Sequence, residues 1–536
     1  MKKKVFIIAG ALVLIATTVC AKNNVAKSNN STVTINIERG IQAFESDNTG
    51  LAMYYFEKEL DENPQNGYAW HFVSITKYFC GEFNAALDAA NTAIEYLPTM
   101  DFDSRSCAHE LRGDIYWSLG DTTNAIKDYN QTIEFAPDNI DVYLNLAQLY
   151  YELGNYNMSS ENFKKLLSID KSLMIGYMGL VRNEALEGNH MEAIKHCDNA
   201  ISIQQDYSPA YINRAYSYIT IKKYDLAIDD ILSALEIDQS DRAFDLLLRM
   251  TESHIRTIEK KLMSKSKQDS ENDLWIQCLA LVYQTNGDYT KAIEQYKVLY
   301  EMKNLPTITH RIAYCYKELG DYTSALSNID ISLKTDSANS DYIMEKAEVL
   351  YELGRADEAI SEMSKYISLD RTFFYGYYRR GFFKDNTADY NGAIEDYTIA
   401  IALEPTYAYA YLGRADMYKA KGEEELAYAD YKKVIEIDTV PESGSCAQYA
   451  YLALGNKERA IEFMNGVIES DKDDAGNYYD AACLYARMGE TKKALNMLET
   501  ALHKGYRRFE HMEKDDDLEN IRSTKEYKKL IEKYKL

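Results

Sequence analysis

Residues 81–98 read GEFNAALDAANTAIEYLP, residues 120–137 read GDTTNAIKDYNQTIEFAP, and residues 287–300 read GDYTKAIEQYKVLY. Each stretch has a small residue five positions after a glycine, and that small residue recurs at steps of 33 or 34 residues in all but two cases. A step of 39 indicates a short insertion near residues 100–105, and a step of 65 indicates a degenerate repeat at residues 242–272. The recurring positions are Ala52, Ala86, Ala125, Ser159, Ala193, Ala227, Ala292, Ala325, Ala359, Ala393, Ala427, Ala460 and Ala494.

The residues around each recurring alanine indicate a helical hairpin. The glycine five positions earlier can adopt the positive φ that ends a helix. A second small residue lies twelve positions before most of the alanines, where it lets two helices approach closely at their crossing. Apolar residues between these marks recur at spacings of three and four, which is typical of helices. Each repeat is therefore predicted to be a helix, a tight turn and a second helix.

With these marks the chain resembles a tetratricopeptide repeat (TPR) protein of an exported bacterial type. The 34-residue repeat of that family has an aromatic residue at position 4, a small residue at 8, Tyr at 11 and Ala at 20. If the recurring alanine is position 20, Tyr411 falls at position 4 and Tyr418 at position 11. The resemblance covers about residues 33–504 and implies an all-α fold, a right-handed α-solenoid of tandem helix-turn-helix repeats. The family's proline at position 32 is kept only at Pro64, Pro98, Pro137 and Pro405.

The composition favours one long array over separate globular domains. Only seven prolines occur in 536 residues, and no Gly/Ser-rich or Pro-rich linker divides the chain. One hairpin exposes apolar faces on both sides, so stacked neighbours must bury those faces and the ends need caps. The predicted parts are a signal peptide at 1–21, a polar linker at 22–32, six repeats at 33–241, a degenerate repeat or junction at 242–272, seven repeats at 273–504 and a helical cap at 505–536.

The first 21 residues predict export to the periplasm or another part of the cell envelope. Lysines at positions 2–4 precede a largely apolar run at residues 5–19, which is shorter than the roughly 20 residues that span a membrane. Residues 19–21 fit a signal-peptidase site, and cleavage there leaves no membrane span. The alternative is a lipid anchor on Cys20. The residues before Cys20 do not match a lipobox, so soluble export is the preferred prediction.

The net charge of −24 disfavours nucleic acid and anionic membrane surfaces as partners, because a field of that sign repels phosphate groups. A basic or neutral protein segment is the better expectation, although acidity also simply keeps a long chain soluble. Seven cysteines would remain after cleavage, and no CxxC motif occurs among them. We predict that they are small buried residues rather than a disulfide framework or a zinc site.

No motif for catalysis or cofactor binding is present. The chain lacks a phosphate-binding loop, GxSxG, HExxH and GxGxxG. The run Asp515-Asp516-Asp517 is interpreted as a solvated charge cluster at a helix start rather than as a metal site. We therefore expect no enzyme activity, no cofactor and no metal.

The TPR resemblance implies a concave groove lined by positions 2, 5, 9, 12 and 13 of each first helix. The densest aromatic stretch is FFYGYYRRGFF at residues 373–383, with Arg379 and Arg380 alongside the rings. Tyr and Arg often dominate binding energies, which favours a partner site, although the rings could merely thicken the packing between first helices. The predicted partner-binding residues are Tyr314, Tyr351, Tyr375, Tyr378, Arg379, Phe382 and Tyr409.

Two further features bear on the partner. Position 5 is never Lys and position 9 is never Asn, so the carboxylate clamp of one TPR subclass is not expected. The degenerate stretch at 242–272 carries a basic run that could be a partner site, a junction or a solvated face. The leading hypothesis is a protein-binding scaffold, and the alternative is a carrier of an envelope polysaccharide, since aromatic rings also stack on sugars.

Overall fold

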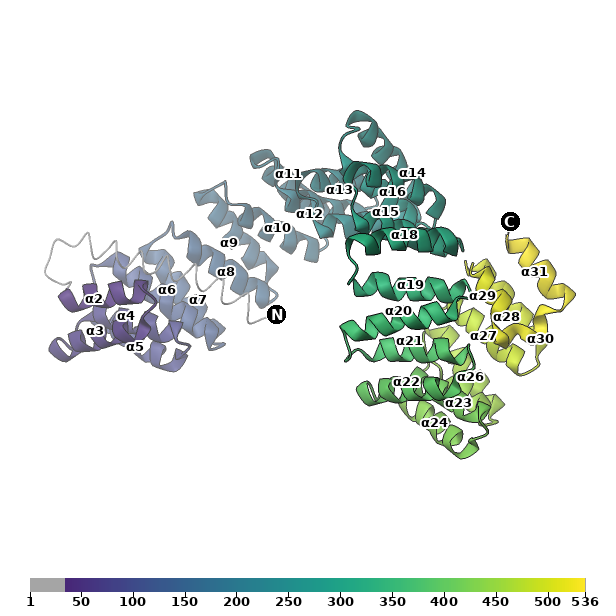
Figure 1. Cartoon of the computed structure of the whole chain (residues 1–536). Coiled ribbons are helices and arrows are strands. Elements are labelled where there is room, and N and C mark those ends of the chain that lie inside the picture. The colour runs from purple at the N-terminus through teal and green to yellow at the C-terminus, as the bar shows by residue number, and fades with distance from the viewer. Residues whose placement is uncertain (1–33, 536) are drawn as a thin grey trace. The chain divides into compact units, whose positions relative to one another are not determined.

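The computed structural model describes residues 34–535, so the predicted signal peptide, Cys20 and the whole polar linker lie outside the described residues. Every regular element within that range is helical, and the range contains no strand. The chain divides between Leu246 and Leu247 into two compact units (Figure 1). The expected all-α architecture of tandem helix pairs is thereby confirmed.

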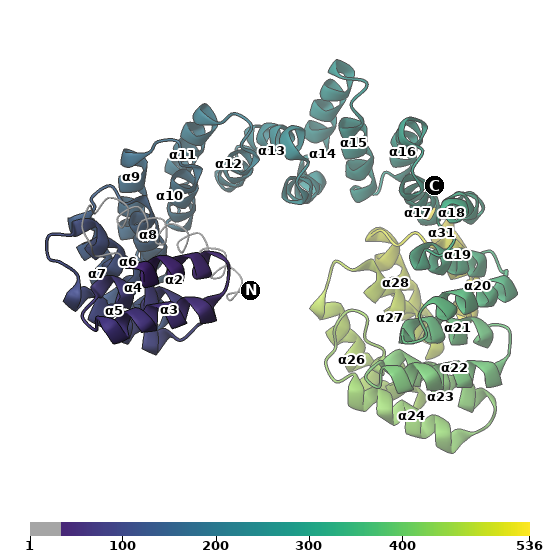
Figure 2. The ribbon, with the colours of Figure 1, turned by 60° about the vertical axis from the view of Figure 1, so that its left-hand side comes forward.

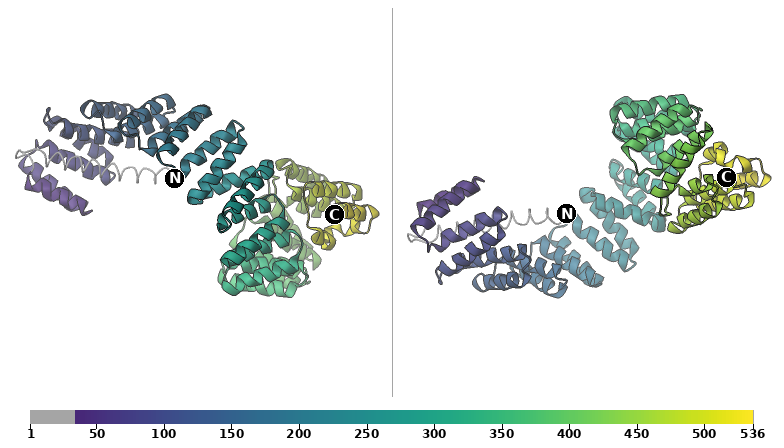
Figure 3. Two further views of the ribbon diagram at one scale, coloured as in Figure 1. Left: turned by 90° about the horizontal axis from the view of Figure 1, so that it is seen from above. Right: turned by 90° about the horizontal axis from the view of Figure 1, so that it is seen from below.

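The N-terminal unit is a series of antiparallel hairpins, each packed on the next (Figure 3). Its helix pairs are α2 (Ile35–Glu45) with α3 (Thr49–Glu62), α4 (Gly67–Phe79) with α5 (Phe83–Tyr96), α6 (Phe102–Ser118) with α7 (Thr122–Phe135), α8 (Ile140–Glu152) with α9 (Tyr156–Ile169), α10 (Met174–Leu186) with α11 (His190–Ile203), and α12 (Ser208–Thr220) with α13 (Tyr224–Asp238).

The C-terminal unit contains seven more hairpins, which follow a curved path (Figure 2). They are α15 (Asp273–Thr285) with α16 (Tyr289–Lys303), α17 (Pro306–Glu318) with α18 (Tyr322–Thr335), α19 (Ser340–Glu352) with α20 (Ala356–Leu369), α21 (Phe374–Asp385) with α22 (Tyr390–Leu403), α23 (Ala408–Ala420) with α24 (Glu424–Ile437), α25 (Ala447–Ala453) with α26 (Lys457–Ser470), and α27 (Ala475–Arg487) with α28 (Thr491–His503).

The degenerate stretch between the two sets of hairpins has no tight turn. It forms α14 (Asp241–Gln268), which is bent at His254, where φ is −132° and ψ is 21°. The division between the two compact units falls within this helix.

After the last hairpin come the short helices α29 (Phe509–Lys514), η1 (Asp516–Leu518), α30 (Glu519–Arg522) and α31 (Lys525–Lys535). Met512, Leu518 and Ile521 from this segment are fully buried in one apolar cluster with Leu498 and Leu502 of α28. The segment therefore covers the apolar face that the last hairpin would otherwise expose to water.

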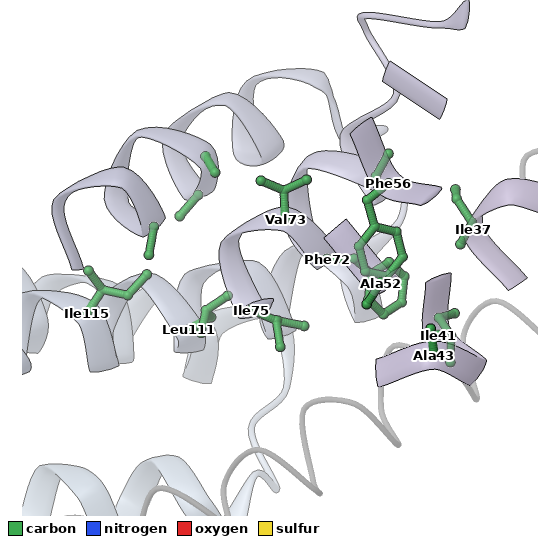
Figure 4. Close-up of a cluster of buried hydrophobic side chains, with 14 residues drawn as sticks. Ile37, Ile41, Ala43, Ala52, Phe56, Phe72, Val73, Ile75, Leu111 and Ile115 are labelled. Carbon is green, nitrogen blue, oxygen red and sulfur yellow. The ribbon is translucent and has the colours of Figure 1, made fainter. Parts of the chain in front are cut away.

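Close packing inside each hairpin depends on the small residues that set the repeat. All thirteen residues at position 20 are at most 1% exposed. A Cβ added at Gly40 would lie 2.3 Å from the Phe56 ring, so only glycine fits at that crossing. Phe56 in turn stacks on Phe72 of the next hairpin, with ring centroids 5.2 Å apart, in an apolar cluster that includes Ile37 (Figure 4).

The hairpin turns share a left-handed backbone residue. Ten turn glycines have φ between 71° and 82°, and no heavy atom lies within 4 Å of a Cβ built on any of them. Three repeats lack the glycine, and there Asp47, Lys222 and Ala388 adopt φ of 59°, 60° and 60°. The repeat imposes this conformation on whichever residue occupies the position, and a residue with a Cβ is strained by it.

Replacing Ala388 with glycine should raise the stability of the C-terminal unit by about 0.5–1 kcal/mol, because glycine relieves the left-handed strain. Urea unfolding followed by circular dichroism measures the change. Ala429→Gly, on the exposed part of α24, should lower stability by about 0.5–1 kcal/mol, as expected for glycine inside a helix. Equal effects of the two substitutions would contradict the strain argument.

An ion pair recurs inside four hairpins, and its arginine also contacts the preceding hairpin. In four repeats an arginine on the first helix binds an aspartate sixteen residues later on the second helix through two hydrogen bonds of 2.6–2.9 Å. The remaining guanidinium nitrogen donates to a side chain of the preceding hairpin. Each arginine therefore stabilises both its own hairpin and the junction before it. The pairs are Arg112–Asp128, Arg214–Asp230, Arg380–Asp396 and Arg414–Asp430.

Candidate partner-binding groove

The first helices α21 and α23 bring three of the predicted groove residues together. The Tyr378 ring lies 5.8 Å from the Tyr375 ring and 6.5 Å from the Tyr409 ring, measured between centroids. All three side chains are half-buried, so part of each ring faces solvent. Burial raises the pKa of Tyr378 to about 12, so its phenol is protonated at neutral pH and can donate a hydrogen bond.

A second group of predicted residues lies between α19 and α21. The rings of Tyr351 and Phe382 are 5.4 Å apart, and the Arg379 guanidinium lies 5.2 Å from the centre of the Phe382 ring. Arg379 is also 3.4 Å from Glu348, while its Nε is buried without a hydrogen-bond partner. This group combines partly buried aromatic rings with a cation whose Nε has no hydrogen-bond partner.

Tyr314 does not join either group. Its closest ring neighbour is Tyr289, 6.3 Å away, and the Lys317 ammonium lies 5.4 Å from the centre of its ring. Six of the seven predicted residues therefore form two neighbouring groups on α19, α21 and α23, and the seventh lies on α17.

Two residues near the predicted site have roles that the sequence analysis did not anticipate. Arg380, expected beside the rings, is engaged by Asp396, which is 1% exposed, and so belongs to the ion-pair series. Tyr407, which was not predicted, lies 5.0 Å from Tyr378 and 4.9 Å from Phe374. Tyr407 directly precedes α23, at a position outside the family's groove set. Its place two residues before Tyr409 was the available signal.

Several carboxyl groups of the C-terminal unit have raised pKa values. Burial and the neighbouring Asp416 and Asp516 raise the pKa of Asp385 to about 6, and burial with nearby aspartates raises the pKa of Asp480 to about 7. Burial also raises the pKa of Asp416, whose Oδ1 accepts a hydrogen bond of 2.5 Å from Tyr431. Burial, which disfavours the charged carboxylate, is the largest cause of all three shifts, and neighbouring aspartates add to it at Asp385 and Asp480.

A cavity of about 890 Å³ lies at one end of these groups. The repeats contribute Lys317, Glu352 and Arg379 to its walls, and the C-terminal segment contributes Tyr506 and Phe509. The cavity thus has walls from hairpins and from the cap, which lie far apart in the sequence.

The aspartates of the cap are only in part the solvated cluster that the sequence suggested, because Asp516 is exposed whereas Asp515 and Asp517 are partly buried. Asp515 accepts a hydrogen bond of 2.6 Å from Tyr479 and a weaker one of 3.6 Å from the Cys483 thiol. Burial raises the pKa of Asp517 to about 6. Possible ligand atoms of Cys483, Asp515 and Asp517 lie within 4.8 Å of one another. The hydrogen bonds from α27 explain why Asp515 packs there, so the predicted solvation holds for Asp516 and not for Asp515.

The N-terminal unit has its own buried carboxylates at groove positions of α6. Glu110 is 5% exposed and accepts a hydrogen bond of 2.8 Å from Asn139. Asp114 is 6% exposed and accepts a hydrogen bond of 2.6 Å from Tyr129. Burial and the Asp114 charge raise the pKa of Glu110 to about 8, and burial raises the pKa of Asp114 to about 7. These groups are sequestered, so they affect stability rather than binding.

Five of the cysteines are buried, as the sequence predicted, and one is not. Cys197, Cys278, Cys315, Cys446 and Cys483 are buried free thiols, whereas Cys80 is exposed, contrary to the prediction of burial. Among the described residues, no helix combines the length and the apolar character that crossing a membrane requires.

Family models match this chain in several places. A model described as TPR repeat matches residues 113–154, and models described as tetratricopeptide repeat match residues 140–173, 208–241, 311–372, 408–440 and 449–474. Together with the helix pairs and the register of buried alanines, these matches show that the chain contains tetratricopeptide repeats.

Several curated proteins are similar over part of their length. A TPR repeat-containing protein of Methanocaldococcus jannaschii is 25% identical over 226 residues, which cover 38% of this chain and 39% of that protein. A DnaJ homolog subfamily C member 7 homolog of Schizosaccharomyces pombe is 23% identical, with 43% and 52% covered. The Hsp70-Hsp90 organizing protein of Triticum aestivum is 25% identical, with 40% and 38% covered. The chain thus spans between about a third and half of the length of these relatives.

Two solved structures are similar to parts of this chain. The C-terminal part of a TPR repeat-containing protein from Cytophaga hutchinsonii is 15% identical, covers 50% of this chain and 95% of that chain, and has a TM-score of 0.39. YrrB, a TPR protein with an unusual peptide-binding site, is 16% identical and covers 35% of this chain and 94% of that chain, with a TM-score of 0.30.

Proposed function

We propose that this chain, which contains tetratricopeptide repeats, is a non-enzymatic protein–protein interaction scaffold of the cell envelope. In this proposal the C-terminal array holds an extended or helical segment of a partner in its concave groove. The observation that carries the proposal is the half-exposed cluster of Tyr375, Tyr378 and Tyr409 beside Tyr351 and Phe382. Neighbouring aromatic side chains that remain partly exposed are the residues that most often dominate binding energy.

The charge of the groove supports a partner segment that carries Lys or Arg. Burial raises the pKa values of Asp385, Asp416 and Asp480, and the charge of an incoming cation would favour the carboxylate form of each. The net charge of −24 would also steer a basic segment toward the array. One relative, the Hsp70-Hsp90 organizing protein, is named for organising other proteins, which agrees with a scaffold role.

The envelope location rests on the export pattern of residues 1–21. Fractionation of cells, with mass spectrometry of the mature N-terminus, tests it. A chain that begins at Lys22 supports soluble export, and a lipid on Cys20 supports an anchored form. A chain that stays in the cytoplasm with Met1 retained would contradict the location.

The groove is tested by photo-crosslinking in the cell from a benzoylphenylalanine placed at Phe382. We expect a specific protein adduct there, and none from the same probe at Tyr428, which is 52% exposed on α24. Changing Tyr375, Tyr378 and Phe382 together to alanine should then lower recovery of that partner at least about tenfold, which corresponds to the loss of one or more hot-spot residues.

Circular dichroism and thermal melting of the triple variant, compared with Tyr428→Ala, establish that the fold persists. Undiminished recovery of the partner by a folded triple variant would contradict the groove proposal.

Aromatic rings also stack on sugars, so calorimetric titration with envelope polysaccharide tests the second candidate function. Binding of polysaccharide that is lost in the triple variant, without any protein adduct, would favour a polysaccharide carrier.

A further inference from the structure

The C-terminal cap reaches across to a hairpin far away in the sequence. The Arg508 guanidinium lies 2.7 Å from Glu352 Oε1, and Lys514 Nζ donates a hydrogen bond of 2.5 Å to the Glu352 carbonyl oxygen. These residues are 156 and 162 positions apart along the chain. Since the other side of the cap packs on α27 and α28, the cap joins the last hairpin to α19.

The packing on α27 fixes the position of this connection. The rings of Tyr506 and Tyr479 are stacked with centroids 4.2 Å apart at an interplanar angle of 9°. Tyr479 also donates the hydrogen bond to Asp515, and Met512 is fully buried. The backbone that carries Arg508 and Lys514 is therefore already fixed by this packing. Forming their contacts with Glu352 costs only the conformational entropy of the two side chains.

The same segment lies beside the predicted partner-binding residues. The Asp516 carboxylate is one of the charges that raise the pKa values of Tyr351 and Asp385, which places it close to both. Tyr506, Arg508 and Phe509 form part of the wall of the 890 Å³ cavity, together with Arg379 on the groove side. The cap thus contributes to the surface of the groove as well as to its end.

We propose that residues 506–514, bound to Glu352, act as a clasp that closes the concave groove of the C-terminal array. A partner segment can enter fully only when the clasp is open. The role of the clasp in admitting a partner rests on the proposed function. The closure itself concerns only this chain and is tested without a partner.

The side chain of Glu352 is 11% exposed, whereas that of Arg508 is 55% exposed. Reversing the charge of Arg508 would therefore place two carboxylates in contact at a largely buried position, which opposes closure. The packing of Tyr506 and Met512 on the last hairpin is not touched by this change. Arg508→Glu should open the clasp while the hairpins remain folded.

Hydroxyl-radical footprinting with mass spectrometry on the full mature chain measures the opening. In Arg508→Glu we expect oxidation of Tyr351 and Phe382 to rise at least about threefold, because the open form becomes the major population. The charge-swapped variant, Glu352→Arg with Arg508→Glu, should return both residues to the wild-type rate. Lys533→Glu makes the same charge change on α31, where the lysine pairs with Glu499, and should leave the rates unchanged.

Unchanged oxidation in Arg508→Glu, an equal rise in Lys533→Glu, or a swapped variant that stays open would overturn the clasp. Tyr397, which is 1% exposed, reports on unfolding. If its oxidation rises as much as that of Tyr351, the contact maintains the fold rather than the groove, and the clasp is refuted. A negative footprint leaves the photo-crosslinking result at Phe382 unaffected, so failure of the clasp and failure of the groove are distinguishable.

Discussion

Replacing Arg414 with alanine is expected to lower the free energy of unfolding of the C-terminal array by about 2–4 kcal/mol, because it leaves a buried carboxylate without its counter-ion. Asp430 is 7% exposed and accepts two hydrogen bonds of 2.8 and 2.9 Å from Arg414. The lower end of the range reflects the partial exposure of the arginine side chain, 16%. The same substitution removes the hydrogen bond to Thr398 of the preceding hairpin, so the junction should weaken as well.

Native-state hydrogen exchange resolves where the loss falls. Amides of α22, α23 and α24 should exchange faster, while those of the N-terminal unit keep their protection. The matched control is Arg414→Met with Asp430→Leu, which removes both charges and should recover most of the loss. If the double variant is as unstable as Arg414→Ala, the lost stability comes from the packing of the arginine side chain and not from the unpaired charge.

Replacing Glu110 with glutamine should stabilise the N-terminal unit by several kcal/mol at pH 8.5 and by little at pH 4.5, with an upper limit of about 5 kcal/mol at about 1.36 kcal/mol for each unit of pKa difference. The folded pKa of Glu110, about 8, lies above the ordinary value of 4.5, so the folded state holds the proton more tightly. The wild-type chain should therefore lose stability as pH rises from about 4.5 to about 8. Glutamine keeps the shape and an oxygen that accepts from Asn139, without the charge.

Urea unfolding monitored through the fluorescence of Trp70 and Trp117, both in this unit, measures the difference at the two pH values. The exposed Glu187→Gln is the control and should leave the pH dependence unchanged. Asp114 remains in the Glu110→Gln variant, so part of the pH dependence should persist. A Glu110→Gln variant that is destabilised at pH 8.5 would show that the carboxylate is held in its charged form.

The sequence predicted those features of the fold that recur in every repeat. The alanine register worked because each alanine, such as Ala359, occupies a helix crossing with no room for a larger side chain. The turn positions were also predictable, because the left-handed residue recurs in every repeat. Ala388 shows that this backbone conformation persists without glycine. The proximity of Tyr378 and Tyr409 was also predictable, because both lie at groove positions of neighbouring first helices.

Contacts outside the repeat register escaped prediction. Arg380 was placed beside the rings, yet the sixteen-residue spacing to Asp396 repeats in four hairpins and was a readable signal. The contact of Arg508 with Glu352 had no such signal. It depends on the small rotation that each hairpin adds to the last, and these rotations accumulate over a long stretch of chain. Local residue patterns do not encode that sum.

The contact between Arg508 and Glu352 also constrains how the gene can change in length. Repeat arrays usually evolve by duplication and loss of whole units, since each unit touches only its neighbours. Insertion of one hairpin between α19 and α28 would move the arginine away from its glutamate, and deletion would do the same. Descendants that keep this contact must keep the count of hairpins in this interval.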